Sequence, residues 1–293
     1  MHIPVLLKES TDGLALKKGS TVFEGTVGLG GHSRVLCEMI GENGTFIGTD
    51  ADQESLSIAE EKLSDVPCKK YFVNENFRNI DTALAKAGAE KVDAILLDIG
   101  LSNRQLDVVP RGFSFMRNEP LLMTFRSSGD GLTARVIVNE WAEESIADII
   151  YGYGEERYAR RIAKGIVEAR KEKSIETSGQ LAEIVGACVP KNLKSRINPA
   201  TKTFQALRIA VNDELGALRE GLAKGFEHLS PKGRIAVISF HSLEDRIVKE
   251  FFKQKQKEEV ATIVTKKPIT PSEAEIKENP KSRSSKLRIL IKN

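Results

Sequence analysis

The chain has 293 residues, of which 40% are hydrophobic and 29% are charged, and its formal net charge at pH 7 is +3. This length permits one large domain or two smaller ones, and the composition is globular rather than disordered or fibrous. No apolar run approaches the roughly 20 residues of a membrane helix, and the first residues do not resemble an export signal. We therefore expect a cytoplasmic protein without a membrane partner.

The first predicted strand, Thr21–Phe23, leads into a turn rich in glycine, and an amphipathic helix is predicted from Arg34 to Ile40. The turn reads Glu24-Gly25-Thr26-Val27-Gly28-Leu29-Gly30-Gly31-His32-Ser33. Glycine permits tight and left-handed turns and lets a ligand approach the backbone without an intervening Cβ. The order of strand, glycine turn and helix predicts a cofactor-binding loop.

A second predicted strand ends at Asp50, about 20 residues after the glycines, where an acid in nucleotide-binding folds contacts ribose hydroxyls. The dinucleotide fingerprint does not fit, because counting from Gly28 places Ser33 at its last glycine position. A carboxylate at Glu24 would repel a pyrophosphate but suits the amino group and sulfonium of S-adenosylmethionine. We therefore predict S-adenosylmethionine as cofactor, with a glycine turn that binds no ligand as the alternative.

Helices and strands alternate from the glycine turn to Asp98, with helices predicted at 51–63 and 80–87 and strands at 70–74 and 92–97. This alternation predicts a parallel, doubly wound sheet that binds ligands at the carboxyl ends of its strands. Glu24, Asp50 and Asp98 each follow a strand, so we expect them to converge at one edge. Phe77 follows the third strand and is a candidate to stack on adenine, with core packing as the alternative.

Beyond residue 99 the alternation lapses into helical patterns without strands, which predict an inserted helical domain. In the pattern at 155–171, apolar positions form one face and basic residues another, namely Arg157, Arg160, Arg161 and Lys164. Such a stripe either meets phosphates or is a solvated face paired with neighbouring glutamates. The next pattern opens with Thr177 and Gln180 in the spacing of a capping box.

A basic connector at 191–196 suits a nucleic-acid interface, and one long helix is predicted from about Thr203 to His228. A buried strand at 234–240 then delivers His241, either a structural residue or a catalytic one near Asp98. Two strand-like segments, 260–264 and 287–291, follow in a basic tail that favours a polyanionic partner.

Several sequence blocks spread over nearly the whole chain match one family in order: His2–Leu7, Gly28–Ser33, Gln105–Asp107, Arg111–Phe115, Tyr153–Arg157, Pro199–Ala206, Ser239–Arg246 and Asn279–Ser284. Together they resemble the bacterial small-subunit ribosomal RNA methyltransferase H family, also called MraW. That family transfers a methyl group from S-adenosylmethionine to the exocyclic N4 of a cytosine in the decoding region of 16S rRNA. The resemblance implies its α/β fold, a class I methyltransferase core with a Rossmann-like doubly wound sheet and an inserted all-helical domain.

We accordingly assign 1–106 and 200–293 to the methyltransferase core and 107–199 to an inserted helical substrate-recognition domain. By the resemblance, the residues that contact S-adenosylmethionine are Gly30, Gly31, His32, Asp50, Phe77, Asp98 and Gln105. The implied partner is 16S rRNA or the small ribosomal subunit. The oligomeric state is left open, with a homodimer as one option.

The chain departs from the family pattern at 120–126, where Leu122 replaces an acid, Thr124 replaces an arginine and Arg126 replaces an acid. These changes remove charges from what resembles the edge of the substrate site. Glu24 and Asn103 also differ from the usual Asp and Ser, but they keep polarity and reach. A methyltransferase-like rRNA-binding protein with weak or no turnover is therefore the first alternative. A small-molecule methyltransferase is the second, and the basic connector and tail argue against it.

Methyl transfer to N4 is an in-line displacement in which the nitrogen must be held roughly 3 to 3.5 Å from the methyl carbon. The lone pair of this amine is conjugated into the ring, so a hydrogen-bond acceptor beside it is needed. Asp98 is our candidate acceptor, and Ser102, Asn103 and His241 are candidates to orient the base. The base must leave its stack to react, which fits a helical domain that holds flipped RNA. The reaction needs no metal.

Overall fold

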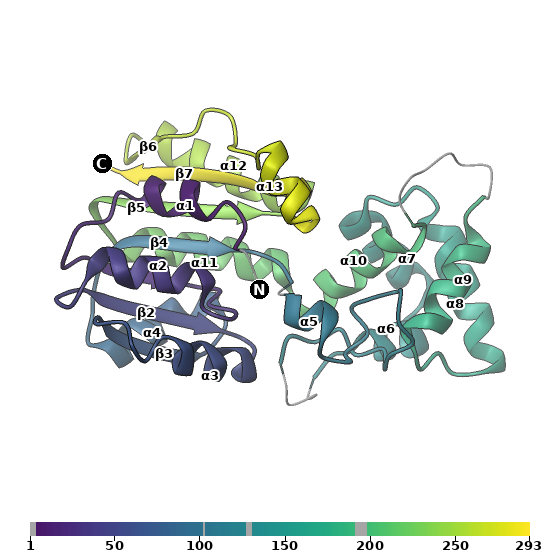
Figure 1. Cartoon of the computed structure of the whole chain (residues 1–293). Coiled ribbons are helices and arrows are strands. Elements are labelled where there is room, and N and C mark those ends of the chain that lie inside the picture. Colours follow the sequence, from purple (N-terminus) through teal and green to yellow (C-terminus); the bar gives the residue numbers. More distant parts are fainter. Residues whose placement is uncertain (1–3, 102, 127–130, 191–197) are drawn as a thin grey trace. The chain divides into compact units, whose positions relative to one another are not determined.

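The computed structural model describes residues 4–101, 103–126, 131–190 and 198–293, apart from the side chains of Asn103 and Asp107. The chain forms two compact units (Figure 1). The first comprises Met1–Gly100 and Leu215–Asn293, and the second comprises Leu101–Glu214. The sequence-based division was placed after residues 106 and 199, so the second unit extends further on both sides.

A seven-stranded sheet in the order β3-β2-β1-β4-β5-β7-β6 forms the centre of the first unit. Strands β1 to β5 are parallel, and β7 runs antiparallel to both β5 and β6. The strands are β1 (Thr21–Glu24), β2 (Thr45–Asp50), β3 (Lys69–Asn74), β4 (Val92–Asp98), β5 (Leu229–Ser239), β6 (Ala261–Ile263) and β7 (Lys286–Lys292). The strand order reverses between β1 and β4, which is where doubly wound sheets bind their ligands.

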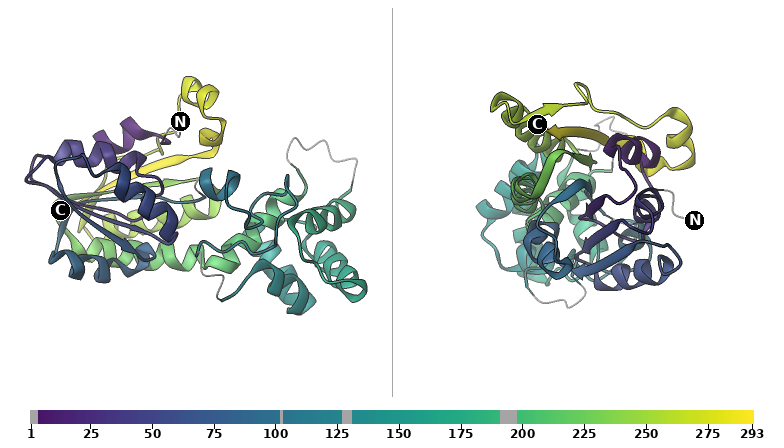
Figure 2. Two further views of the ribbon diagram at one scale, coloured as in Figure 1. Left: turned by 60° about the horizontal axis from the view of Figure 1, so that its bottom comes forward. Right: turned by 90° about the vertical axis from the view of Figure 1, so that its left-hand side faces the viewer.

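Helices cover both faces of this sheet, as the further views in Figure 2 show. The α-helices of this unit are α1 (Leu7–Leu14), α2 (Gly31–Ile40), α3 (Gln53–Lys62), α4 (Ile80–Ala87), α11 (Glu214–His228, with Glu214 in the second unit), α12 (Ser242–Lys257) and α13 (Glu273–Glu278). Along β4, Leu96 faces the core formed by α1, α2 and α3, whereas Ile95 and Leu97 face the core formed by α4, α11 and α12. Burial on both faces explains why β4 is a continuous apolar run.

The regular secondary structure of the second unit's described part is helical, apart from one isolated bridge between Pro120 and Thr177. Its helices are α5 (Asn103–Asp107), α6 (Ala134–Glu140), α7 (Glu143–Gly154), α8 (Ala159–Glu172), α9 (Ser178–Cys188) and α10 (Ala200–Asn212). A separate core contains Ile137, Ile150, Ile162, Leu181 and Leu207, all of them fully buried. The predicted capping box of α9 is confirmed, because the Thr177 and Gln180 side chains bind each other's backbone N–H groups.

The prediction of one long helix from Thr203 to His228 is wrong. The segment divides into α10 and α11 at Asp213, whose φ of 48° is left-handed and ends α10. The preceding side chain, Asn212, accepts a hydrogen bond from the Phe125 N–H and donates one to the Met123 carbonyl. These long-range contacts fix the chain at the break, and the apolar periodicity continues across it.

Among the described residues, no helix has both the length and the apolar character that crossing a membrane requires.

Candidate active site

Three acids lie at the carboxyl ends of neighbouring strands in the first unit. Strand β1 ends at Glu24, β2 at Asp50 and β4 at Asp98, and β1 pairs with β2 on one side and β4 on the other. The three strand ends therefore meet at the point where the strand order reverses. The predicted convergence is confirmed by this pairing.

The glycine turn between β1 and α2 uses its glycines for two physical reasons. Gly28 and Gly30 have φ angles of 54° and 81°, in the left-handed region that other residues rarely adopt. Gly31 has no room for a side chain, since an added Cβ would lie 2.5 Å from the Cγ of Pro4. Helix α2 begins at Gly31, with Gly30 as its N-cap.

We expect Gly28→Ala to lower the free energy of unfolding by about 1 kcal/mol, because the left-handed conformation strains a Cβ. An added Cβ at Gly28 would meet nothing within 4 Å, so the substitution adds backbone strain without a steric clash. Gly28→Asn should lose less, since Asn tolerates this conformation better. Urea unfolding of both variants measures the difference, and equal losses would contradict the strain argument.

Asp50 holds the glycine turn through its carboxylate. Its Oδ2 accepts a hydrogen bond of 2.7 Å from the Gly28 N–H, and its Oδ1 accepts one of 2.8 Å from the Asp52 N–H. Burial raises the pKa of Asp50 to about 6, against these hydrogen bonds, which favour the charged form. Asp50 is thus a partly buried acid that fixes the geometry of the loop.

Glu24 is fully buried beneath the same turn. The Ser33 hydroxyl donates a hydrogen bond of 2.5 Å to Glu24 Oε2, while Oε1 has no hydrogen-bond partner among the described residues. Burial raises the pKa of Glu24 well above its ordinary value, and the nearby charges of Asp98 and Asp50 act in the same direction. Glu24 Oε1 is therefore a buried acceptor without a partner among the described residues, and a cationic ligand would pair with it.

A hydrogen bond from its backbone N–H holds Asp98 in place, and one oxygen of its side chain is left to accept a hydrogen bond from a ligand. The Asp98 N–H donates to Thr26 Oγ1 at 2.8 Å, and the buried Oδ1 has no hydrogen-bond partner among the described residues. Burial, followed by the negative charge of Glu244, raises the pKa of Asp98 to about 7. A carboxyl group with this pKa is ionised in about half of the molecules near neutral pH, as suits a group that exchanges protons.

His32 lies beside Asp98 at the start of α2. Its Nε2 is 3.1 Å from the Val5 carbonyl, which can only accept, so Nε2 carries the proton. Its Nδ1 is 3.7 Å from Asp98 Oδ2. The other ring nitrogen thus faces the carboxyl group of Asp98.

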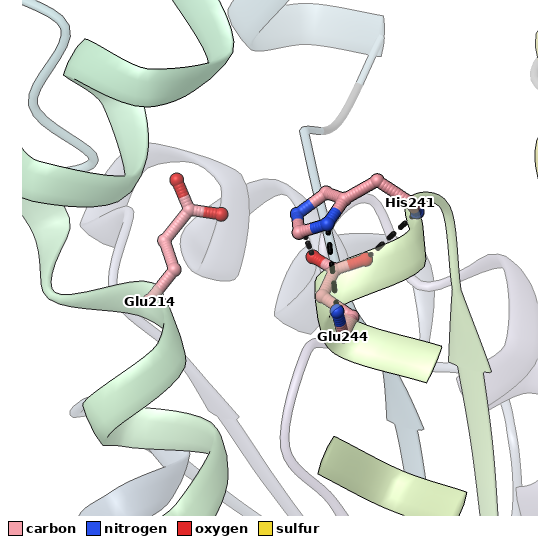
Figure 3. Close-up of side chains that lie close together, drawn as sticks. All are labelled: Glu214, His241 and Glu244. Atoms are coloured by element: carbon pink, nitrogen blue, oxygen red, sulfur yellow. Dashed lines mark hydrogen bonds and ion pairs between the residues drawn. The ribbon is translucent and has the colours of Figure 1, made fainter. Parts of the chain in front are cut away.

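His241 caps helix α12 at the end of β5. Its Nδ1 accepts a hydrogen bond of 3.4 Å from the Glu244 N–H, and Glu244 Oε2 accepts hydrogen bonds from the Phe240 and His241 N–H groups. The other ring nitrogen lies 3.1 Å from Glu244 Oε1, and Figure 3 shows the imidazole beside this carboxylate. Glu214, also drawn there, belongs to the second unit, where Arg208 holds its carboxylate. The His241 side chain is therefore engaged in a capping box.

Phe77 begins the short 3-10 helix Phe77–Asn79 after β3 and is half-buried. A Cβ added at Gly25 would lie 2.6 Å from the Phe77 Cβ, and one added at Gly221 would lie 2.5 Å from its ring. Phe77 thus packs between the glycine turn and α11. This position is compatible with both predicted roles, stacking on adenine and packing on the core.

The remaining predicted site residues lie in the second unit. Ser102 is outside the described residues, and the Asn103 side chain is not described, although its backbone begins α5. Gln105 lies in α5 and is buried. The altered segment is packed in the same unit, with Thr124 buried and its hydroxyl accepting from the Arg126 N–H.

Sequence reasoning did not assign a role to Thr26, Ser33 or Glu244. Thr26 accepts a hydrogen bond from the Asp98 N–H, and Ser33 donates one to Glu24. Glu244 raises the pKa of Asp98. The spacing of His241 and Glu244 matches a capping box and could have identified Glu244. No local pattern distinguishes Thr26 and Ser33 within the glycine turn. Their partners, Asp98 and Glu24, are brought close to them only by the fold.

Comparison with known proteins gives a consistent result. The model of the MraW methylase family matches residues 1–293. A protein of Symbiobacterium thermophilum is 44% identical, covering 99% of this chain and 96% of its own length. One from Persephonella marina is 47% identical over 98% of each chain. Both carry the name ribosomal RNA small subunit methyltransferase H.

Among solved structures, an rRNA methylase from Streptococcus thermophilus matches with a TM-score of 0.48 and 12% sequence identity, covering 100% of this chain and 99% of that one. The matched family and the seven-stranded α/β unit confirm the family and the fold class expected from the sequence, that of class I S-adenosylmethionine-dependent methyltransferases. Since the family model and the named relatives each cover essentially the whole chain, this protein belongs to the MraW methylase family.

Proposed function

We propose that this protein transfers a methyl group from S-adenosylmethionine to the exocyclic N4 of a cytosine in the decoding region of 16S rRNA. The observation that carries the proposal is the family match over residues 1–293. The rRNA substrate agrees with the printed names of the relatives. We place the reaction in the cytoplasm, with the small ribosomal subunit as partner.

The acidic strand ends fit the proposed cofactor. Glu24 Oε1 and Asp98 Oδ1 are both buried and unpartnered among the described residues. A ligand that carries a sulfonium and an ammonium group would stabilise the ionised carboxylates, whereas a pyrophosphate would be repelled. S-adenosylmethionine supplies an electrophilic methyl group when it is bound.

We assign the cofactor contacts to the glycine turn, to residues at or after the strand ends and to Gln105. The backbone of the glycine turn lies against the cofactor, Asp50 accepts hydrogen bonds from the ribose, and Phe77 packs on the adenine. The proposed set is Gly30, Gly31, His32, Asp50, Phe77, Asp98 and Gln105.

Asp98 is the proposed catalytic residue. Its carboxylate accepts a hydrogen bond from the N4 amine, which directs the nitrogen lone pair toward the methyl carbon. With the cofactor bound, Asp98 would take the proton that N4 loses as the amine accepts the methyl group, and the cofactor would leave as the neutral thioether S-adenosylhomocysteine. Ser102, Asn103 and His241 are proposed to orient the base. His241 would do so from the start of helix α12, which it caps. The helical unit is proposed to hold the flipped nucleotide.

The rate should depend on the ionisation of Asp98. Because its pKa is raised to about 7 and the carboxylate is the active form, we expect kcat/KM to rise between about pH 6 and 8 and then level off. A pH–rate profile at low concentrations of both rRNA and S-adenosylmethionine, where the rate reports the free enzyme, measures this. A flat profile over that range would exclude Asp98 as the proton acceptor.

Glu244→Gln should shift this profile to lower pH, since the substitution removes the negative charge that raises the pKa of Asp98. The amide oxygen of Gln can still accept from the Phe240 and His241 N–H groups. The shift is measured against the wild-type profile, with thermal unfolding as the control for α12. An unshifted profile in a folded variant would contradict the proposed electrostatic coupling.

A binding protein without turnover is the rival that the altered segment at 120–126 suggests. Incubating the protein with methyl-labelled S-adenosylmethionine and small subunits that lack the native N4 modification separates the two. We expect stoichiometric label in 16S rRNA. Cofactor and subunit binding without transfer of label would favour the rival.

A further inference from the structure

Helix α8 of the second unit presents a line of cations to solvent. It packs against α7 and α9 (Figure 1) and buries Ala159, Ile162, Ala163 and Ile166. The same periodicity leaves four basic residues exposed, one of them just before the helix, and we call them the α8 stripe: Arg157, Arg160, Arg161 and Lys164. Positions three and four apart lie on one side of a helix, so these side chains are neighbours.

No ion pair joins the stripe to any described residue, although acids are close in sequence. The Arg157 guanidinium lies over the Tyr158 ring, 4.7 Å from its centroid. Glu156 is buried and accepts from the Tyr158 N–H, and Glu168 pairs with Lys171 one turn further along. Glu168 also attracts Lys164 electrostatically, whereas the three arginines of the stripe have no ion pair with a described acid.

The helix that carries the stripe is firmly held in its unit. At Gly165, an added Cβ would lie 2.3 Å from the Cys188 Sγ, so α9 approaches the α8 backbone closely at this point. The Arg170 guanidinium at the other end of the helix donates to the Val138 carbonyl. The cations are thus presented on a fixed scaffold, which lowers the entropy lost on binding.

We propose that the α8 stripe binds the phosphate backbone of the rRNA substrate. This inference rests on the proposed function and assigns part of the substrate contact to a defined surface. Arginine binds phosphate oxygens through two parallel N–H donors, and exposed cations without acidic partners are free to do so. RNA is favoured over a lipid surface because none of the exposed large apolar residues lies on α8, and an interfacial helix needs an apolar face to insert.

The test replaces Arg160, Arg161 and Lys164 together with Gln and measures binding to small subunits that lack the native modification, at 50 to 200 mM KCl. Each lost phosphate contact reduces the magnitude of the slope of log K against log salt by roughly 0.7 to 0.9, so losing three should reduce it by roughly 2.1 to 2.7. We expect the dissociation constant and KM for subunits to rise at least about 10-fold. Affinity for S-adenosylmethionine and kcat should stay unchanged.

A matched variant replaces the exposed lysines Lys86, Lys253 and Lys257 of the first unit with Gln and removes the same charge. We expect it to keep the wild-type slope; an equal effect would mean that only net charge matters and would overturn the proposal. Unchanged binding of the stripe variant to subunits would also overturn the proposal. So would a stripe variant that binds subunits normally but no longer binds phosphatidylglycerol vesicles, to which the wild-type protein binds. If the wild-type protein transfers no methyl group, the proposed function fails instead, and the slope comparison still tests the stripe.

Discussion

Asp50→Ala is expected to abolish measurable binding of S-adenosylmethionine, with a dissociation constant raised at least about 100-fold. The carboxylate has two tasks that Ala cannot perform. Its oxygens fix the Gly28 and Asp52 N–H groups, which sets the shape of the glycine turn. In the proposed complex it also accepts hydrogen bonds from the ribose, and charged acceptors contribute about 1.5 to 3 kcal/mol each. Isothermal titration calorimetry measures the loss.

Asp65→Ala is the control for this experiment. Asp65 is an exposed acid of the same unit that pairs with Arg34 on helix α2. We expect wild-type cofactor affinity for it. Thermal unfolding shows whether Asp50→Ala remains folded. A folded Asp50→Ala protein with unchanged affinity would refute the assignment.

Asp98→Asn is expected to lower kcat by about 100-fold or more, the usual range for loss of a general base. Asn keeps the size of the side chain and the backbone hydrogen bond to Thr26. It is neutral, so it also removes the cost of burying a carboxylate, and we expect stability to stay the same or rise. Residual activity should no longer change near pH 7. Single-turnover kinetics with small subunits measure the chemical step.

The control is Asp93→Asn, the same substitution on the same strand. Asp93 is exposed near the start of β4, where it accepts from the Thr21 N–H. We expect its kcat to equal that of the wild type. Full activity in the Asp98→Asn protein would require another proton acceptor.

The strand ends were predictable from sequence because their geometry follows from local patterns. Alternating helices and strands imply a parallel sheet, and a parallel sheet places the residues after its strands at one edge. Glu24, Asp50 and Asp98 were therefore placed together without any knowledge of their contacts. The pKa values of these acids could not be predicted, since they depend on burial and on Glu244, which follows another strand.

The break at Asp213 shows where local reasoning ends. Apolar residues continue in helical register through it, and only contacts with Met123 and Phe125, distant in sequence, fix the turn. His241 illustrates the same limit, because its position after β5 does not reveal that its ring caps α12. Loss of charge at Thr124 is likewise compatible with the fold, since this side chain is buried in the helical unit.

The most direct test of the account is nucleoside mass spectrometry of 16S rRNA after incubation of unmodified small subunits with the pure protein and S-adenosylmethionine. We expect one N4-methylcytidine per 16S rRNA, in the decoding region, and formation at least about 100-fold slower with Asp98→Asn. Unmodified cytidine with the wild-type protein, or a methyl group on any other atom, would contradict it.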